Sequence, residues 1–274
     1  MENNNYLIAL DLDGTLLNDN KEITLTTKKY LNKLEKEGNL IVICSGRAPR
    51  SIIDYYKFLD ITSPIISYNG ALCFDPRNDK FKTICYKIDT SFTKKLYKEI
   101  INKEVISILA EDDNHIYCDK EDDFLFAFFK KDNMEIIDKK FDENEIDSTY
   151  IFVMKMKDES EETKNSLLKK FKQIDNESKY KLRFWRDCPY CEIHFKDVSK
   201  ANTLEKLRKT ENIKGDNVFV FGDADNDIEM LSNYNHSYLM KNGNPKIKEY
   251  AKNITEFDNN NDGVIKELKK FFDN

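Results

Sequence analysis

Four short apolar runs, each followed by small polar or acidic residues, most strongly constrain how this chain can fold. They are Leu7–Leu10, Leu40–Ile43, Ile65–Ile66 and Val218–Phe221. Strands that are apolar along their whole length are typical of a parallel sheet buried on both faces. Between the first two runs, residues 24–38 carry apolar side chains at helical spacing and end at a glycine, which predicts a strand, helix, strand unit. The sequence therefore predicts an α/β core with a doubly wound, Rossmann-like parallel sheet.

The middle third of the chain has a different pattern. A helix is expected over residues 91–103, and alternating strands are expected over 150–157 and 181–186, none of which ends in the same acidic signature. We therefore expect an inserted α+β domain over residues 85–189, with the core formed by residues 1–84 and 190–274. An insertion of this kind can act as a lid over a site. Residues 258–262, which include three asparagines, are expected to form a solvated loop before the last helix.

Charge and hydropathy exclude several classes of partner. The 274 residues include 44 basic and 50 acidic side chains, and no basic stripe is present, so nucleic acid is disfavoured. Residues 1–5 carry no basic side chain and the apolar run after them is short, so no secretory signal is expected, and no apolar stretch reaches membrane-spanning length. We therefore expect a cytoplasmic protein that does not bind membranes, and a monomer is favoured over an oligomer.

Six scattered cysteines in a chain without a secretory signal favour reduced thiols over a disulfide framework. Cys188 and Cys191 have the spacing of a dithiol redox site. Such a site needs its first cysteine at the N-terminus of a helix, where the thiol pKa falls, but a strand-like run follows here. Neither a redox site nor a zinc site is therefore favoured, because no second pair with ligand spacing accompanies this one.

Two carboxylates, Asp11 and Asp13, follow the first apolar run directly and precede a Gly-Thr turn. Ligands collect at the carboxyl ends of strands in open parallel sheets. Two buried acids this close raise each other's pKa unless a cation lies between them. Magnesium prefers oxygen ligands and is the expected partner.

Further polar residues follow the other strands or begin helices. These residues are Ser45, Lys200, Asp223 and Asp227, and with Asp11 and Asp13 they form one polar set. Phosphoryl transfer through a protein needs these residue types: a carboxylate nucleophile, a second acid, and a cation with a lysine and hydroxyl or amide donors to offset charge.

In these motifs the chain resembles the haloacid dehalogenase superfamily of hydrolases, and within it the Cof type, subfamily IIB, with a cap of the C2B type. The resemblance covers nearly the whole chain. Its first motif, from Asp11 to Thr15, implies that Asp11 is the nucleophile and Asp13 the general acid and base, both also holding magnesium. Its second motif implies that Ser45 and Gly46 bind phosphate.

The remaining motifs complete the implied site. Lys200 is implied to neutralise the phosphate, and the segment from Gly222 to Asp227 is implied to bind the metal through Asp223 and Asp227. Further matches to the family lie at residues 69–71, 242–251 and 262–264. Ala201 stands where the family more often has glycine, and Ser45 where it often has threonine, which keeps the hydroxyl.

Several residues keep two interpretations. Asn226 assists the phosphate or caps a helix, and Asp227 holds the metal or Lys200. Arg47 and Asn69 bind substrate or serve the structure. In the insertion, a leaving-group role is possible for three residues, although packing is favoured for the tryptophan: Arg183, Trp185 and Arg186.

The sequence thus predicts a magnesium-dependent phosphatase that hydrolyses small phosphorylated metabolites such as sugar phosphates through an aspartyl-phosphate. One alternative is a phosphomutase of the phosphomannomutase type, which returns the phosphoryl group to a sugar. Another is a phosphoacceptor module of the receiver type. Its phosphoacceptor lies on a separate strand from its acid pair and it carries no large insertion, so both features of this chain argue against it.

Overall fold

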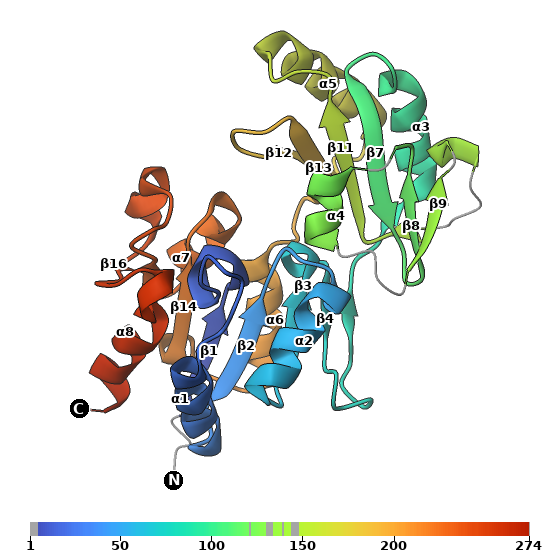
Figure 1. The fold of residues 1–274 in the computed structure, drawn as a ribbon. Helices are drawn as coiled ribbons and strands as arrows, with labels where there is room; N and C mark the ends of the chain where they lie inside the picture. Colours follow the sequence, from blue (N-terminus) through green and yellow to red (C-terminus); the bar gives the residue numbers. More distant parts are fainter. Residues whose placement is uncertain (1–4, 121, 130–133, 139, 144–147, 274) are drawn as a thin grey trace. The chain divides into compact units, whose positions relative to one another are not determined.

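The computed structural model describes residues 5–120, 122–129, 134–138, 140–143 and 148–273, and it divides into two compact units. The core unit runs up to Ile84 and resumes at Ser199, and the inserted unit spans Cys85–Val198. Figure 1 shows both units, each with its own sheet and helices.

The core unit contains an eight-stranded sheet in the order β16-β15-β14-β1-β2-β3-β4-β5. The pairs from β16 through to β3 are parallel, whereas β3 and β4 are antiparallel. The strands are β1 (Leu7–Leu10), β2 (Leu40–Cys44), β3 (Ile65–Ser67), β4 (Leu72–Phe74), β5 (Ile84–Cys85), β14 (Val218–Gly222), β15 (His236–Leu239) and β16 (Asn253–Ile254). All four predicted apolar runs are strands of this sheet.

Helices cover both faces of the sheet, as the continuously apolar strands predict (Figure 1). Alternate residues of β1 face opposite cores: Ile8 packs in the cluster with α1, α2 and α8, and Ala9 packs in the cluster with α6 and α7. The helices are α1 (Leu25–Lys36), α2 (Pro49–Leu59), α6 (Lys200–Thr210), α7 (Ile228–Asn233) and α8 (Gly263–Phe272). The core is therefore an α/β doubly wound fold, as expected.

The inserted unit contains a six-stranded sheet in the order β12-β13-β11-β7-β8-β9, in which β8 and β9 pair in parallel and the other neighbouring strands pair antiparallel. Its main strands are β7 (Val105–Glu111), β8 (His115–Cys118), β9 (Glu135–Asp138), β11 (Ile151–Met156), β12 (Tyr180–Phe184) and β13 (Tyr190–Phe195). Two short strands, β6 (Ile88–Asp89) and β10 (Ser148–Thr149), pair separately. The helices are α3 (Thr90–Ile100), α4 (Asp123–Phe129) and α5 (Glu161–Ile174).

The second boundary of the insertion differs from the expected one. Sequence patterns end the insertion at residue 189, but β13 is hydrogen-bonded between β11 and β12 and so belongs to the inserted sheet. The chain rejoins the core unit only at Ser199, immediately before α6. The first boundary falls between Ile84 and Cys85, where the sequence puts it.

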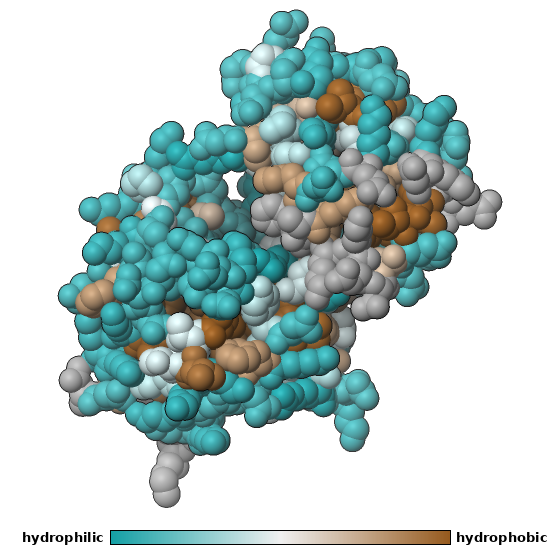
Figure 2. Space-filling view, in the orientation of Figure 1, coloured by the Kyte–Doolittle hydropathy of each residue, from teal (hydrophilic) through white to brown (hydrophobic). Residues whose placement is uncertain are grey.

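Each unit has its own apolar core, and polar side chains dominate the face shown in Figure 2. In the inserted unit, the buried cluster joins the sheet to α3 and α5 through residues such as Phe92, Leu96 and Leu167. Among the residues that the structure describes, no helix is long and apolar enough to span a bilayer.

Candidate active site

The candidate site lies where the central strands of the core sheet end. Asp11 directly follows β1, Ser45 follows β2, and Asp223 follows β14. Strand β1 lies between β2 and β14 and runs parallel to both, so the three chain segments leave the sheet at the same edge. The backbone N–H of Asp11 also donates to the carbonyl of Phe221 at 3.1 Å, which extends the ladder to the acidic residue.

Lys200 is the central cation of the site. Its side chain is 0% exposed, and its Nζ donates to Asp11 Oδ1 at 2.5 Å and to Asp227 Oδ1 at 2.7 Å. It stands at the first turn of α6, where the Ser199 side chain accepts a hydrogen bond from Asn202 N–H. A cation at a helix N-terminus is unfavourable by itself, so the two carboxylates are what retain it there. They also raise the pKa of Lys200, against the effect of its burial.

Asp227 holds two neighbouring elements together. Its Oδ2 accepts from the backbone N–H groups of Asp223 at 3.0 Å and Ala224 at 3.1 Å, while its Oδ1 binds Lys200. A Cβ at Gly222 would lie 2.5 Å from Asp227 Cγ, so only glycine fits at this end of β14. Of the two interpretations from sequence, contact with Lys200 is the one that the structure shows directly.

Asp11, Asp223 and Asp227 each offer an oxygen atom within 4.8 Å of the other two. Burial and the surrounding carboxylates raise the pKa of Asp11 to about 7, although Lys200 opposes this rise. Burial, Asp11 and Asp227 likewise raise the pKa of Asp223 to about 8. The buried carboxylates of Asp11 and Asp227 and the half-buried carboxylate of Asp223 thus lie near a single ammonium group. A divalent cation with oxygen preference fits this donor set, because it would balance the excess negative charge.

Asp13 forms ion pairs with two other cationic side chains. Arg47 donates to both of its carboxylate oxygens at 2.7 Å, and Lys21 donates to Oδ1 at 2.8 Å. Burial acts to raise the pKa of Asp13, but the hydrogen bonds and charges of Arg47 and Lys21 outweigh it and lower that pKa. Arg47 also lies over the ring of Tyr55. Sequence left Arg47 between a substrate role and a structural one, and the structure shows it as the partner of Asp13.

The turn that follows Asp11 lies close to the side chain of Asp223. Within the helical turn η1 (Leu12–Leu16), Gly14 has a φ of +71°, in the left-handed region that favours glycine. A Cβ at Gly14 would lie 2.4 Å from Asp223 Oδ2. The Thr15 hydroxyl is 3.5 Å from Asp223 Oδ1. Gly14 is therefore required both by its backbone conformation and by the approach of Asp223.

The predicted phosphate-binding residues form a second group at the same edge. Ser45 is buried, and its Oγ accepts from the backbone N–H of Arg47 at 3.2 Å. Asn69 N–H donates to Ser45 O at 3.1 Å, and Asn226 Nδ2 donates to Asn69 Oδ1 at 3.0 Å. The side chain of Asn69 also packs against Gly46. Three of the residues expected to bind phosphate, Ser45, Gly46 and Asn226, thus all contact Asn69, whereas Lys200 contacts Asp11 and Asp227.

The residues singled out in the inserted unit pack within that unit. Arg183 pairs with Glu192 across β12 and β13, and Trp185 lies against Tyr190 at 5.7 Å between ring centroids. Arg186 pairs with the neighbouring Asp187. These contacts agree with the packing interpretation of the tryptophan.

Both cysteines of the dithiol pattern are free thiols. Cys191 lies within β13, and burial raises the pKa of Cys188 rather than lowering it. The electropositive helix N-terminus that activates a thiol is therefore missing here.

Sequence reasoning did not assign roles to several residues that contact this site. Lys21 precedes α1 without any motif, and its contact with Asp13 depends on how the chain folds back. Asn242 donates to the carbonyl of Gly14 at 2.7 Å. Its position within a stretch that matches the family was the one available signal. Asn259 is only 6% exposed, so the segment expected as a solvated loop is partly buried.

Comparisons with known proteins agree with this geometry. A family model described as haloacid dehalogenase-like hydrolase matches residues 8–268. The chain is 30% identical to the 5-amino-6-(5-phospho-D-ribitylamino)uracil phosphatase of Bacillus subtilis over 272 residues, 99% of both chains. It superposes on the crystal structure of a Thermotoga maritima protein with a TM-score of 0.79 at 26% identity, over 97% of both chains. A structure named as a haloacid dehalogenase subclass IIB sugar phosphatase matches with a TM-score of 0.78 over 97% of this chain and 98% of that one, and its 21% identity shows the shared fold alone.

Proposed function

This chain belongs to the haloacid dehalogenase-like hydrolases, of the Cof type, and hydrolyses phosphate esters, and from that premise we propose that it is a magnesium-dependent phosphatase of small phosphorylated metabolites. The observation that carries the proposal is the contact between the buried Lys200 and Asp11, beside the carboxylate of Asp223. This arrangement offers a nucleophile, a cation for the phosphoryl group and a set of metal ligands at one sheet edge.

Asp11 is the proposed nucleophile. Its Oδ1 is bound by Lys200, which leaves Oδ2 to attack phosphorus and form an aspartyl-phosphate while the bond to the leaving oxygen breaks. The leaving oxygen takes a proton from Asp13. Lys200, the Ser45 hydroxyl and the Gly46 N–H offset the charge on the transferring oxygens.

Asp13 then acts as a base in the second step. It takes a proton from a water that attacks phosphorus, the bond to Asp11 breaks, and inorganic phosphate leaves. The contacts with Arg47 and Lys21 favour the ionised form of Asp13, which suits this second step. Asp13 can donate in the first step only when these contacts loosen.

The proposed metal is Mg²⁺, held by the side chains of Asp11 and Asp223 and by Asp13. It would supply positive charge to the phosphoryl oxygens and to the carboxylates around Lys200. Asp227 belongs to the same cluster, and its contacts support a role in fixing Lys200 and the Asp223 loop beside the metal.

The proposed substrates are sugar or polyol phosphates. The Bacillus subtilis relative is named for a phosphorylated ribityl compound, and the structurally similar subclass IIB protein is named a sugar phosphatase. The inserted unit is proposed to select the leaving group. The relatives support neither the phosphomutase nor the receiver alternative, because they are named as phosphatases.

A phosphate-release screen with Mg²⁺ tests the proposal. The panel should contain hexose and pentose phosphates, 5-amino-6-(5-phospho-D-ribitylamino)uracil and nucleoside monophosphates. We expect inorganic phosphate from at least one sugar or polyol phosphate and none after chelation by EDTA. Turnover that persists in EDTA would contradict the metal assignment, and isomerisation of a sugar phosphate without phosphate release would indicate a mutase.

A further inference from the structure

Two asparagines outside the acidic cluster bind the backbone of the turn that carries Asp13. The side-chain amide of Asn242 is used at both ends: Nδ2 donates to Gly14 O at 2.7 Å, and Oδ1 accepts from the backbone N–H of Asn259 at 3.0 Å. These two contacts fix which way the amide faces. Gly14 is the residue after Asp13, so the contact acts on the peptide next to the proposed acid.

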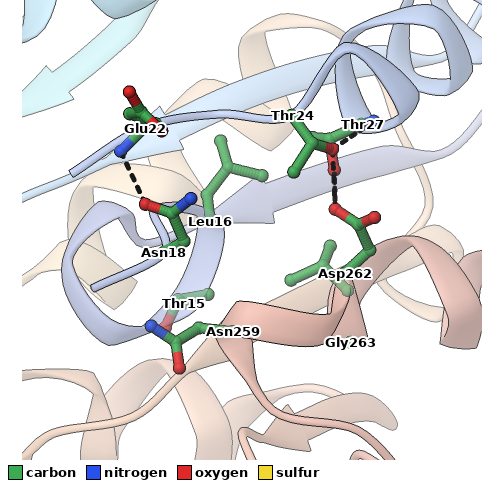
Figure 3. Close-up of a pocket in the computed structure, with 10 residues that line it drawn as sticks. Thr15, Leu16, Asn18, Glu22, Thr24, Thr27, Asn259, Asp262 and Gly263 are labelled. Carbon is green, nitrogen blue, oxygen red and sulfur yellow. Dashed lines mark hydrogen bonds between the residues drawn. The ribbon is translucent and has the colours of Figure 1, made fainter. Parts of the chain in front are cut away.

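Asn259 holds the other end of the same turn. It is 6% exposed, and its Nδ2 donates to Leu17 O at 3.0 Å and to Asp19 Oδ1 at 3.1 Å. Figure 3 shows Asn259 next to Thr15, in the short helical turn η7 (Asn259–Asn261) that precedes α8. The turn from Gly14 to Leu17 is therefore bound at its first carbonyl by Asn242 and at its last by Asn259.

The segment that carries Asn242 also contacts the loop of Asp223. Met240 N–H donates to Gly222 O at 2.9 Å, and Asn244 N–H donates to Asp223 O at 2.8 Å. One short segment thus connects the two loops that hold the proposed metal ligands. A change at Asn242 would alter the position of the Asp13 turn relative to the Asp223 loop.

Resting on the proposed function, we propose that Asn242 and Asn259 are positioning residues that hold Asp13 where it can transfer a proton to the leaving group. Neither side chain needs to touch substrate. Proton transfer depends on distances of hydrogen-bond length, so a shift of the turn by a fraction of an ångström is enough to weaken it. The segment at residues 258–262 is thus a support of the site rather than a solvated connection.

The test compares two esters that differ in their need for an acid. p-Nitrophenyl phosphate has a weakly basic leaving group and needs little protonation, whereas the alkoxide of ribose 5-phosphate or glucose 6-phosphate needs it strongly. We expect Asn242→Ala to lower kcat/KM for the faster of the two sugar phosphates by at least about 10-fold, out of the roughly 10²–10⁴-fold that acid catalysis provides, because kcat/KM reports the steps up to departure of the leaving group and not the second step. The kcat/KM for p-nitrophenyl phosphate should fall by less than about 3-fold. Asn259→Ala should change the ratio of the two kcat/KM values in the same direction.

Asn261→Ala is the matched control. Its Nδ2 donates to Asp258 Oδ1 within the same loop and it contacts neither Gly14 nor Leu17, so the ratio should stay at the wild-type value. The ratio is measured within one preparation, so loss of folded protein cancels out. An equal loss on both esters, or no loss, would overturn the inference. A wild-type enzyme that hydrolyses neither ester with Mg²⁺ would instead overturn the proposed function, and this inference with it.

Discussion

A lysine without exposed surface is stable in a fold only when anionic partners replace its water, and Lys200 has two. Asp11 and Asp227 accept from the same ammonium group, while Asp227 also accepts from two backbone N–H groups. Removing either carboxylate would leave an incompletely paired buried charge. The contact between Lys200 and Asp11 therefore serves the structure and the proposed chemistry together.

Replacing Asp11 by asparagine separates these two roles. Asparagine keeps an oxygen that accepts from Lys200, but it cannot form an acyl phosphate with the substrate. We expect Asp11→Asn to lower phosphate release by at least about 10³-fold while the protein stays folded by circular dichroism. The exposed Asp225 binds Asn244 in the neighbouring loop, so Asp225→Asn is a suitable control. Turnover of Asp11→Asn at the wild-type rate would exclude Asp11 as the nucleophile.

Replacing Cys188, the first cysteine of the dithiol pattern, is expected to leave activity nearly unchanged. Because burial raises the pKa of Cys188 and no helix begins there, we expect Cys188→Ser to leave phosphate release within about 2-fold of wild type. The same assay under reducing and oxidising conditions provides the comparison. A large loss in the variant, or a redox-dependent rate in the wild type, would support a thiol role.

At the scale of elements, the turn between β1 and α1 is constrained by its own backbone and by distant side chains. A buried parallel strand leads into it, and Gly14 lets the chain turn back toward the Asp223 loop with a positive φ. The carbonyls of Gly14 and Leu17 accept from the side chains of Asn242 and Asn259. The turn is thus defined by its own glycine and by partners more than two hundred residues away.

Gly14→Ala tests this constraint. A Cβ would meet Asp223 Oδ2 at 2.4 Å, and the left-handed conformation alone costs about 1–2 kcal/mol for a non-glycine residue. We expect a lower free energy of unfolding in urea and a large loss of phosphate release. Gly215→Ala is the matched control, because nothing lies within 4 Å of its added Cβ. Equal unfolding midpoints for the two variants would contradict the steric argument.

For the molecule as a whole, the main feature is that both units have an apolar core but the charged site residues all belong to the core unit. Each unit packs its own apolar cluster, whereas the site places three carboxylates and one ammonium group in the core unit alone. Burial and mutual repulsion raise the pKa of Asp11 to about 7 and that of Asp223 to about 8 in the metal-free protein. The charge balance of the core unit is therefore expected to depend on pH and on bound cation.

The sign of this dependence follows from the raised pKa values. Between the ordinary value of 3.8 and about 7 or 8, the folded protein holds protons on these carboxyls that the unfolded chain releases. Their contribution to metal-free stability is present at low pH and is lost as pH rises through about 7 to 8. Mg²⁺ binds the ionised carboxylates, so we expect its stabilising effect to grow over the same range. At about 100 times its Kd, the ion should add about 2.7 kcal/mol at the alkaline end.

Thermal melts with and without millimolar Mg²⁺, from about pH 5 to about pH 9, measure this effect. The difference in Tm between the two conditions should increase with pH in the wild type. Asp223→Asn removes one proposed ligand and should give a small difference at every pH. A wild-type difference that is independent of pH, or that shrinks as pH rises, would contradict the assignment.

Sequence by itself determined the sheet of the core and the edge of that sheet at which several of the proposed site residues lie. Apolar runs that end in polar residues predict buried parallel strands, and the carboxyl ends of such strands meet at one edge. Asp11, Ser45 and Asp223 could therefore be grouped without coordinates. The insertion was also visible, because the strand pattern changes near Cys85.

Only the tertiary structure decided the contacts between loops. Arg47 and Lys21 converge on Asp13, and Asn242 and Asn259 bind the turn beside it, through side chains that no local periodicity distinguishes from surface residues. The end of the insertion was decided in the same way, because β13 is assigned by its hydrogen-bond partners rather than by its own composition. The local pattern of apolar residues predicts which strands are buried, whereas hydrogen bonds between loops depend on where the folded sheet brings distant backbone groups.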